Sequence, residues 1–249
     1  MSLRRFLTPP GGLSKGEVAL LPGEAAHARK VLRLAPGAKV ELIDGAGLRA
    51  RGTLTRLDKQ GGAVRVEAVE AAPLPAPRLV LCPGLLKAPA MDLIAVKLTE
   101  LAVDQVRPML CSRAVPQLKD ARAKQERWAR LARQALKQCG AARAPEFLPP
   151  ASLDEVLAAP PTGALRLLLY EGEQQTTLAA ALGQAGPAEE VWALIGPEGG
   201  FAPDEAASAQ AAGFVSCGLP HTILRAETAC LAVASVIRFA WEVDHGKTL

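Results

Sequence analysis

Two turn-forming segments in the C-terminal half of the chain carry the residues best suited to chemistry. The first, Gly196-Pro-Glu-Gly-Gly200, interrupts an apolar run that begins at Val191, and Ala202-Pro-Asp-Glu205 then starts an alanine-rich helix. Three glycines in five positions remove the Cβ atoms that would keep a ligand away from the backbone, so main-chain amides can face a bound molecule. The second segment, Ile223-Leu-Arg-Ala-Glu-Thr-Ala229, adds an arginine just before the last helix and a glutamate in its first turn. Taken alone, the first segment is equally compatible with an ordinary turn between a strand and a helix.

The spacing excludes the two common nucleotide-binding motifs. No Lys-Ser or Lys-Thr follows the glycines, as a Walker loop requires, and no Gly-x-Gly-x-x-Gly opens a first strand, as a dinucleotide-binding fold requires. The histidines at positions 27, 221 and 245 form no H-x-x-x-H or H-E-x-x-H pattern. We therefore expect no metal site.

The composition indicates a globular protein. With 249 residues and 49% hydrophobic content, the chain can bury one large core or two smaller ones. No apolar run reaches the ~20 residues of a membrane span, and the segment after Met1-Ser-Leu-Arg-Arg-Phe6 lacks the apolar core of a signal peptide. The cysteines at positions 82, 111, 139, 217 and 230 are odd in number and form no C-x-x-C pair. We expect a soluble, cytoplasmic protein with buried free thiols.

The charged residues are unevenly distributed, although the net charge is only +4. Residues 1–70 contain 12 Lys/Arg and 7 Asp/Glu, residues 107–143 contain 10 and 2, and residues 144–249 contain 4 and 13. Two basic regions on a chain with an acidic C-terminal part suit a polyanion bound at one surface and different chemistry at another. Nucleic-acid binding is therefore favoured, with a merely solvated helix face as the alternative.

The N-terminal part is predicted to be a small β-domain. Short β segments separated by glycine are expected at 17–21, 38–44, 48–57 and 63–69, with one amphipathic helix over 23–34. Because strands this short need closure or packing to be stable, we expect a small β-barrel. The proline-rich segment 71–77 cannot donate into a sheet and is biased towards extended backbone. We place the boundary there, with domains at 1–72 and 73–249.

Beyond this boundary the pattern predicts an α/β domain. Strands are expected at 78–82, 106–110, 165–170, 191–195 and 214–219, and helices at 90–103, 119–140 and 226–243. The long basic helix is expected to bury a narrow apolar stripe formed by Trp128, Leu131, Ala132, Ala135 and Leu136. Alternating strands and helices indicate a parallel sheet covered on both faces, whose ligands bind at the carboxyl ends of the strands. Three of these ends lead into unusual loops, at 170–172, 196–200 and 218–222.

Several segments together resemble the RsmE family of small-subunit ribosomal RNA uridine N3-methyltransferases. They are Leu194-Ile-Gly-Pro-Glu-Gly-Gly-Phe201, Ile223-Leu-Arg-Ala-Glu-Thr-Ala229, Lys97-Leu-Thr-Glu-Leu-Ala-Val103, Arg4-Arg-Phe6 and the run 24–33. The resemblance implies a PUA-like β-barrel that binds RNA, followed by a SPOUT α/β domain with a C-terminal trefoil knot. It also implies a homodimer that takes a methyl group from S-adenosylmethionine and methylates N3 of one uridine near the 3′ end of 16S ribosomal RNA in the assembled small subunit. The chain departs from the family pattern at Pro220-His-Thr222, where an arginine and a glycine are missing.

Carried over position by position, the resemblance places the cofactor among three loops. The expected cofactor-binding residues are Leu169, Tyr170, Glu171, Gly196, Pro197, Glu198, Gly199, Gly200, Leu219, Ile223, Leu224, Arg225, Ala226, Glu227 and Thr228. Their high glycine content suits a bent cofactor held by main-chain groups.

Two of these residues are candidates for catalysis. Methylation at N3 of uracil requires loss of the N3 proton, so the protein must supply position, a dry pocket and a proton acceptor or an anion stabiliser. We expect Arg225 to stabilise the developing uracil anion through O2 or O4, and Glu198 to orient the substrate or accept the proton. The alternatives are structural: Glu198 bonds to backbone amides of its own loop, Glu227 caps the final helix, and Arg225 pairs with either carboxylate. His221 is a weak candidate for a base.

Candidates for RNA contacts lie in the two basic regions. They are Arg4, Arg5, Arg29, Lys30 and Arg33 near the N-terminus, and Arg122, Arg130 and Arg133 on the long helix. Phosphate contacts position RNA without reading its sequence, and a uridine whose N3 is paired must be flipped out before it reacts. Two other functions stay open: a non-catalytic RNA-binding or ribosome-assembly factor, and a knotted methyltransferase that acts on another RNA such as tRNA.

Overall fold

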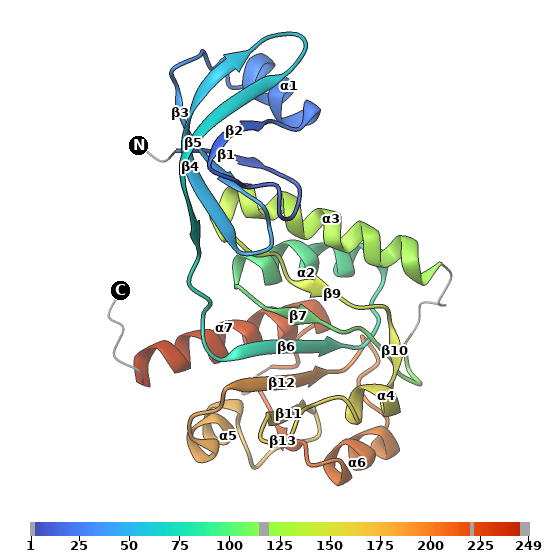
Figure 1. Cartoon of the computed structure of the whole chain (residues 1–249). Coiled ribbons are helices and arrows are strands. Elements are labelled where there is room, and N and C mark those ends of the chain that lie inside the picture. Colours follow the sequence, from blue (N-terminus) through green and yellow to red (C-terminus); the bar gives the residue numbers. More distant parts are fainter. Residues whose placement is uncertain (1–2, 115–119, 220–221, 245–249) are drawn as a thin grey trace. The chain divides into compact units, whose positions relative to one another are not determined.

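The computed structural model describes residues 3–114, 120–219 and 222–244 (Figure 1). The chain forms two compact units, one of Met1–Leu74 with Arg133–Ala144 and one of Pro75–Ala132 with Pro145–Leu249. Residues 72–77, where the sequence places the domain boundary, belong to no helix or strand. The segment 133–144 lies in the part of the sequence assigned to the second domain, yet it groups with the first unit because Leu136 packs with Leu7 and Ile43.

The first unit is built on a five-stranded sheet with the order β1-β3-β4-β5-β2. Its strands are β1 (Arg4–Leu7), β2 (Gly16–Ala19), β3 (Lys39–Ile43), β4 (Leu48–Leu57) and β5 (Gly62–Ala71). The β1–β3 pair is parallel and the other pairs are antiparallel. Helix α1 (Pro22–Lys30) contributes Ala25 and Ala28 to a core with Phe6, Leu42 and Leu54.

The second half of α3 (Ala121–Cys139) is fastened to this sheet by polar contacts as well as by Leu136. The guanidinium of Arg133 donates to the carbonyl oxygens of Asp44, at 3.0 Å, and Thr8, at 2.9 Å. Lys137 forms an ion pair with Glu24, whose side chain is 9% exposed. These contacts make the end of α3 part of the fold of the first unit.

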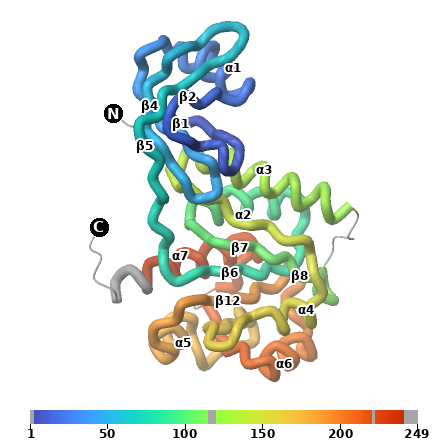
Figure 2. Tube along the Cα trace, viewed as in Figure 1, coloured from blue at the N-terminus to red at the C-terminus, as the bar shows by residue number. Residues whose placement is uncertain are grey.

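The second unit contains a six-stranded sheet in which every neighbouring pair is parallel, with the order β13-β11-β12-β6-β7-β9. Its strands are β6 (Arg78–Pro83), β7 (Gln105–Val106), β9 (Glu146–Phe147), β11 (Leu165–Leu169), β12 (Glu190–Ile195) and β13 (Val215–Cys217). Strand β12 therefore lies between β11 and the much earlier β6. Figure 2 shows the chain at β6 and β12 running side by side. The carboxyl ends of all these strands meet at one edge.

Helices cover this sheet, as the alternating pattern predicts. They are α2 (Ala88–Glu100), α4 (Leu153–Leu157), α5 (Leu178–Ala185), α6 (Pro203–Ala211) and α7 (Ala226–Asp244). Alternate sheet residues Val80, Trp192 and Leu194 pack with α4 and α6 in one buried cluster. Helix α7 contacts α2, α5, β6 and β12. Because Leu79 and Val191, which point the other way along the same strands, are also fully buried, both faces are covered.

The single strand predicted at 106–110 is wrong. Pro108 has no N–H to donate, so the run divides into β7 in the main sheet and β8 (Met109–Leu110), which pairs with β10 (Ala151–Ser152). The predicted stripe on α3 is confirmed, since Trp128, Ala132, Ala135 and Leu136 are buried and Leu131 is half-buried.

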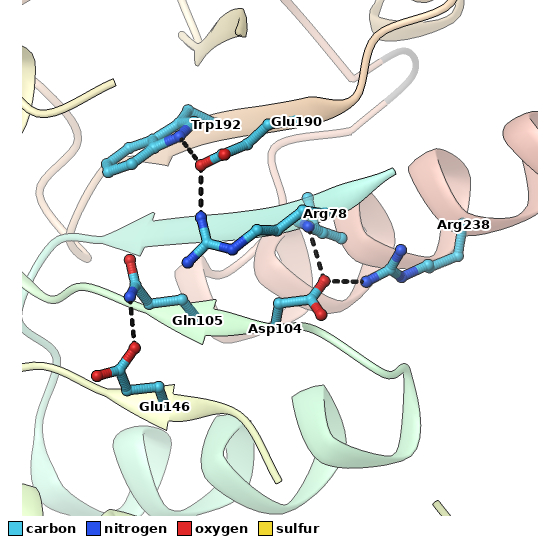
Figure 3. Close-up of polar contacts among 8 residues, drawn as sticks. Arg78, Asp104, Gln105, Glu146, Glu190, Trp192 and Arg238 are labelled. Carbon is cyan, nitrogen blue, oxygen red and sulfur yellow. Dashed lines mark hydrogen bonds and ion pairs between the residues drawn. The ribbon is translucent and has the colours of Figure 1, made fainter. Parts of the chain in front are cut away.

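One polar cluster joins three elements of the second unit (Figure 3). Arg238 on α7 is 5% exposed and donates to the carboxylate of Asp104 at 2.7 Å and to the carbonyl oxygens of Pro77 and Ala102. Asp104 also accepts the N–H of Leu79 at 2.8 Å. The start of β6, the end of α2 and α7 are thus tied at one point.

None of the helices in the described ranges combines the length and the apolar character that a membrane span requires.

Candidate functional site

A cavity of about 830 Å³ opens in the second unit where β6, β11, β12 and β13 end. Its walls come from the loops that follow these strands and from the first residues of α2 and α7. Of the fifteen predicted cofactor residues, thirteen line it: Leu169, Tyr170, Glu171, Gly196, Pro197, Glu198, Gly200, Leu219, Ile223, Leu224, Arg225, Ala226 and Glu227. Gly199 and Thr228 do not. The structure therefore brings together segments more than fifty residues apart, as the position of the loops at strand ends predicts.

The glycine-rich loop needs its last glycine for two reasons. Gly200 has a φ of +68°, a conformation that side-chain-bearing residues rarely adopt, and its N–H donates to the Pro197 carbonyl at 2.9 Å. A Cβ on Gly200 would lie 2.4 Å from the Oε1 of Glu171. The carboxylate of Glu171 therefore lies directly against the backbone of this loop, inside the cavity wall.

A glycine at the end of β6 lets a second loop approach the same turn. A Cβ on Gly84 would lie 2.5 Å from the backbone nitrogen of Pro197, and the Gly84 N–H donates to the Ile195 carbonyl at 2.7 Å. The connection from β6 to α2 is thus in direct backbone contact with the glycine-rich loop.

The two predicted catalytic residues differ in their surroundings. Glu198 accepts the backbone N–H of Lys87 through Oε1 at 3.2 Å, so it bonds to the start of α2 rather than to its own loop. Arg225 is exposed, and no carboxylate of the described residues lies within ion-pair distance of it. The alternative in which Arg225 is neutralised by Glu198 or Glu227 has no support in this part of the structure. His221 lies outside the described residues.

The outer side of the glycine-rich loop is held by the segment after β8. The guanidinium of Arg113 donates to the carbonyl oxygens of Gly199 and Phe201, both at 3.3 Å. Glu205, at the start of α6, accepts the N–H groups of Ala202 at 2.8 Å and Ser112 at 2.7 Å. Arg113 was not predicted, because its contact joins positions 86 residues apart with no motif in common.

Carboxylates outnumber cations on the cavity wall. Among the described residues, Glu171, Glu173, Glu198 and Glu227 line it together with two basic residues, Lys87 and Arg225. Bonds from the backbone N–H groups of Thr176 and Gln175 hold the pKa of Glu173 below its usual value, so it is ionised at neutral pH. Burial raises the pKa of the Cys217 thiol on the same wall to about 12, so it stays protonated. The wall suits a ligand that carries positive charge.

The sequence motifs do not predict one wall of the cavity. It consists of residues at the start of α2: Lys87, Pro89, Ala90 and Leu93. The usable signal was positional, since β6 runs parallel to β12 and must end at the same edge of the sheet. No glycine-rich motif marks this segment apart from the single Gly84.

The predicted RNA residues fall into two groups. Arg5 forms an ion pair with Glu41 at 2.5 Å and Arg133 bonds to backbone carbonyls, so both guanidinium groups have partners inside the first unit. Arg4, Lys30 and Arg33 are exposed, whereas Arg29 is half-buried with its Nε unpaired. On α3, Arg130 is exposed and Arg122 pairs with Glu126 while remaining 88% exposed. The described part of the chain contains no cluster of three or more potential metal ligands.

Comparison with protein-family models assigns the class of protein. A model described as an RNA methyltransferase domain matches residues 72–238, and one described as an RNA methyltransferase PUA domain matches residues 22–67. The chain is therefore an RNA methyltransferase with a PUA-like N-terminal domain, as the resemblance implied.

Individual relatives narrow the class. Ribosomal RNA small subunit methyltransferase E of Mycobacterium bovis is 31% identical, with 92% of this chain and 90% of the relative covered. The protein of that name from Synechocystis is also 31% identical, over 90% of this chain and 74% of the relative. The crystal structure of the Neisseria gonorrhoeae protein of the same name, bound to S-adenosyl methionine, matches with a TM-score of 0.82 and 26% identity, covering 96% of this chain and 98% of that one. The chain belongs to the ribosomal RNA small subunit methyltransferase E family, which confirms the resemblance drawn from its motifs.

Proposed function

We propose that this protein transfers a methyl group from S-adenosylmethionine to N3 of one uridine near the 3′ end of 16S ribosomal RNA, in the assembled small subunit. The observation that carries the proposal is the shared cavity, whose wall includes both the turn ending at Gly200 and the exposed residue Arg225. Family membership supplies the reaction class, and the cavity supplies a place for it.

The size and the charge of the cavity support this cofactor. Its volume of about 830 Å³ lies within the range of roughly 300–1,000 Å³ that encloses small ligands. Gly196 and Gly200 leave their parts of the cavity wall without Cβ atoms, and the excess of carboxylates favours a sulfonium and an ammonium group. We propose that the fifteen residues expected from the sequence hold the cofactor, with Gly199 and Thr228 acting through their neighbours. When bound, the cofactor supplies an electrophilic methyl group.

The residues of the chain then have three tasks. The loops must orient the uracil so that N3 faces the methyl group, exclude water, and stabilise the charge that develops as the N3 proton leaves. We propose that Arg225 stabilises that charge through O2 or O4 and that Glu198 accepts the proton or orients the base. The bond between Glu198 and the Lys87 N–H supports a fixed position for the carboxylate.

RNA binding is assigned to the PUA-like domain and to α3. Arg4, Lys30 and Arg33 are the exposed candidates of the first unit, with Arg29 beside them, and Arg122 and Arg130 are the candidates on α3. Arg5 and Arg133 are structural in this proposal, since their guanidinium groups bond within the fold. The proposed domains remain 1–72 and 73–249, with 133–144 completing the packing of the first.

Quaternary structure and chain topology extend the proposal. Leu93 on α2 and Phe239 on α7 are 42% and 57% exposed, and α2 and α7 pack together, so an apolar surface is available for a second copy. We propose a cytoplasmic homodimer in which the last part of the chain is threaded as a trefoil knot.

The alternative function, a non-catalytic RNA-binding or ribosome-assembly factor, predicts no binding of the methyl donor.

Two measurements test the proposal. Calorimetry should show S-adenosylmethionine binding to the purified protein, and mass mapping of 16S ribosomal RNA from a deletion strain should show one uridine that has lost a methyl group. Complementation with the wild-type gene should restore the methyl group, whereas Arg225→Ala should not. A complete 16S methylation pattern in the deletion strain would exclude this substrate, and an absence of donor binding would favour the non-catalytic alternative.

A further inference from the structure

Lys87 is a second cation in the cavity, and it has no carboxylate partner in the part of the chain that the structure describes. It lines the cavity from the residue before α2, its side chain is exposed, and no ion pair within the described residues includes it. The motifs of the sequence give it no role. Arg225, the residue before α7, is the other cation of the cavity wall without an ion pair among the described residues.

The backbone of Lys87 is fixed to the glycine-rich loop. Its N–H donates to Oε1 of Glu198 at 3.2 Å, and three residues earlier Gly84 lies against Pro197 so closely that a Cβ would be 2.5 Å from its nitrogen. Leu85 is held on the other side by its N–H bond to the Met109 carbonyl at 2.8 Å. The point from which the lysine side chain leaves is therefore set by the same loop that shapes the cofactor wall.

The carboxylates of the cavity do not neutralise this ammonium group. Glu173 is engaged by backbone N–H groups, Glu198 by the Lys87 N–H itself, and Glu171 lies against Gly200. Glu227, the fourth carboxylate of the wall, forms no ion pair with Lys87 in the described part of the chain. Lys87 and Arg225 thus both line the cavity in which, under the proposed function, a uracil must lose its proton. A uracil anion spreads its charge over two oxygens, O2 and O4, which flank N3 on either side, so two cations can each stabilise one of them.

We propose that Lys87 is a second electrostatic catalytic residue, which stabilises the uracil oxygen that Arg225 does not contact. In this step the N3–H bond breaks and the proton passes to Glu198, the electron pair of N3 forms the new N–CH3 bond, and the S–CH3 bond breaks with its electron pair left on sulfur. Lys87 gives and takes no proton; it lowers the energy of the charge on oxygen before the methyl group moves. This inference rests on the proposed function.

The test compares Lys87→Ala, Lys87→Gln and Lys87→Arg with a control in the helix that follows Lys87, Lys97→Ala. Lys97 lies on α2 but pairs with Glu100 at 2.9 Å and is not part of the cavity. None of the Lys87 substitutions removes the backbone N–H that Glu198 accepts, so the loop contact is kept. The substrate is the small ribosomal subunit isolated from the deletion strain, and the readouts are kcat, KM for the subunit and the dissociation constant of S-adenosylmethionine.

We expect kcat to fall about 10²-fold in Lys87→Ala and Lys87→Gln, the usual loss when one stabilising group is removed from a transition state. Lys87→Arg should recover most of the rate, and Lys97→Ala should match the wild type. Affinity for the methyl donor and KM for the subunit should each change by less than about threefold.

A substrate analogue separates anion stabilisation from other roles. Fluorine at C5 makes N3 of uracil more acidic, so subunits reconstituted with 5-fluorouridine in their RNA need less help from a cation. The gap in kcat between wild type and Lys87→Ala should therefore narrow by about tenfold with this substrate. An unchanged gap would overturn the proposal. So would a loss confined to KM, which indicates a phosphate contact, or weaker donor binding, which indicates a contact with the donor carboxylate. If wild-type protein methylates no uridine with either substrate, the proposed function itself fails.

Discussion

Arg238 and Asp104 form the most enclosed ion pair among the described residues, with the Arg238 Nη2 2.7 Å from the Asp104 Oδ2 and side-chain exposures of only 6% and 14% (Figure 3). The two residues are 134 positions apart in the sequence, and their bond connects α7 to the segment between α2 and β7. Since α7 begins with the residues that line the cavity, the pair anchors the far end of an element of the site.

Breaking this pair should destabilise the protein strongly. Arg238→Met leaves the Asp104 carboxylate buried without its cation and leaves the carbonyl oxygens of Pro77 and Ala102 without their donor. We expect the free energy of unfolding to fall by about 3–5 kcal/mol, the range found when one partner of a buried pair is removed. Denaturant unfolding followed by tryptophan fluorescence measures it. The matched control is Arg122→Met, whose pair with Glu126 is 88% and 63% exposed and should cost less than about 1 kcal/mol. Equal effects of the two changes would contradict the assignment.

Gly200→Ala should impair donor binding without unfolding the protein. The positive φ costs a residue with a Cβ about 1–3 kcal/mol, and the new methyl group would displace Glu171 from its position 2.4 Å away. We expect calorimetry to show a loss of roughly tenfold to hundredfold in affinity, since about 1.4 kcal/mol corresponds to tenfold. Gly183→Ala is the control, because Gly183 lies inside α5 with no atom within 4 Å of the added Cβ. That change should raise stability by about 0.5–1 kcal/mol and leave affinity unchanged. Unaltered affinity in Gly200→Ala would remove this loop from the donor site.

The sequence predicts those parts of the site that follow from the direction of the strands and from the period of the helices. Parallel strands end at one edge, so the loops at 170–172, 196–200 and 218–222 could be expected to converge before any coordinates were known, and the structure places thirteen of the expected residues around one cavity. The buried stripe of α3 followed from a period of 3.6 residues in the same way.

What could not be predicted depends on contacts between distant segments. Three such contacts join positions that share no sequence pattern. Gly84 packs on Pro197, Arg113 donates to the Gly199 carbonyl, and Arg133 donates to the carbonyl oxygens of Asp44 and Thr8. Lys87 and Arg5 illustrate the consequence, because the sequence does not distinguish either from the other basic residues. In the structure, Arg5 forms an ion pair with Glu41 within the fold, whereas Lys87 lines the cavity and is in no ion pair among the described residues. The division of the 106–110 segment at Pro108 could, in contrast, be predicted from the sequence, because proline has no N–H to donate to a neighbouring strand.

RNA binding should depend on exposed cations of the first unit and not on those used by the fold. Lys30→Ala with Arg33→Ala removes two exposed charges near the end of α1, so binding to a 16S fragment should weaken and the slope of log K against log salt should fall by about 2. Donor affinity should stay the same. Arg133→Ala is the contrasting variant: it removes bonds to Thr8 and Asp44, so it should lower stability and leave the slope nearly unchanged. If the double variant keeps the wild-type slope, the RNA surface lies elsewhere.

Thiol reactivity offers an independent check of burial around the cavity. Burial raises the pKa of Cys111, Cys217 and Cys230 to about 12 and raises that of Cys82 as well, whereas Cys139 is exposed at the end of α3. At pH 8, a thiol with a pKa of about 12 is ionised in only about one molecule in ten thousand, and the thiolate is the reactive form. A thiol reagent should therefore modify one cysteine quickly in the native protein and all five after denaturation. Cys139→Ser should abolish the fast phase. A second fast thiol that S-adenosylmethionine protects would identify Cys217, and would mean that the cavity wall is more open than the packing of β13 indicates.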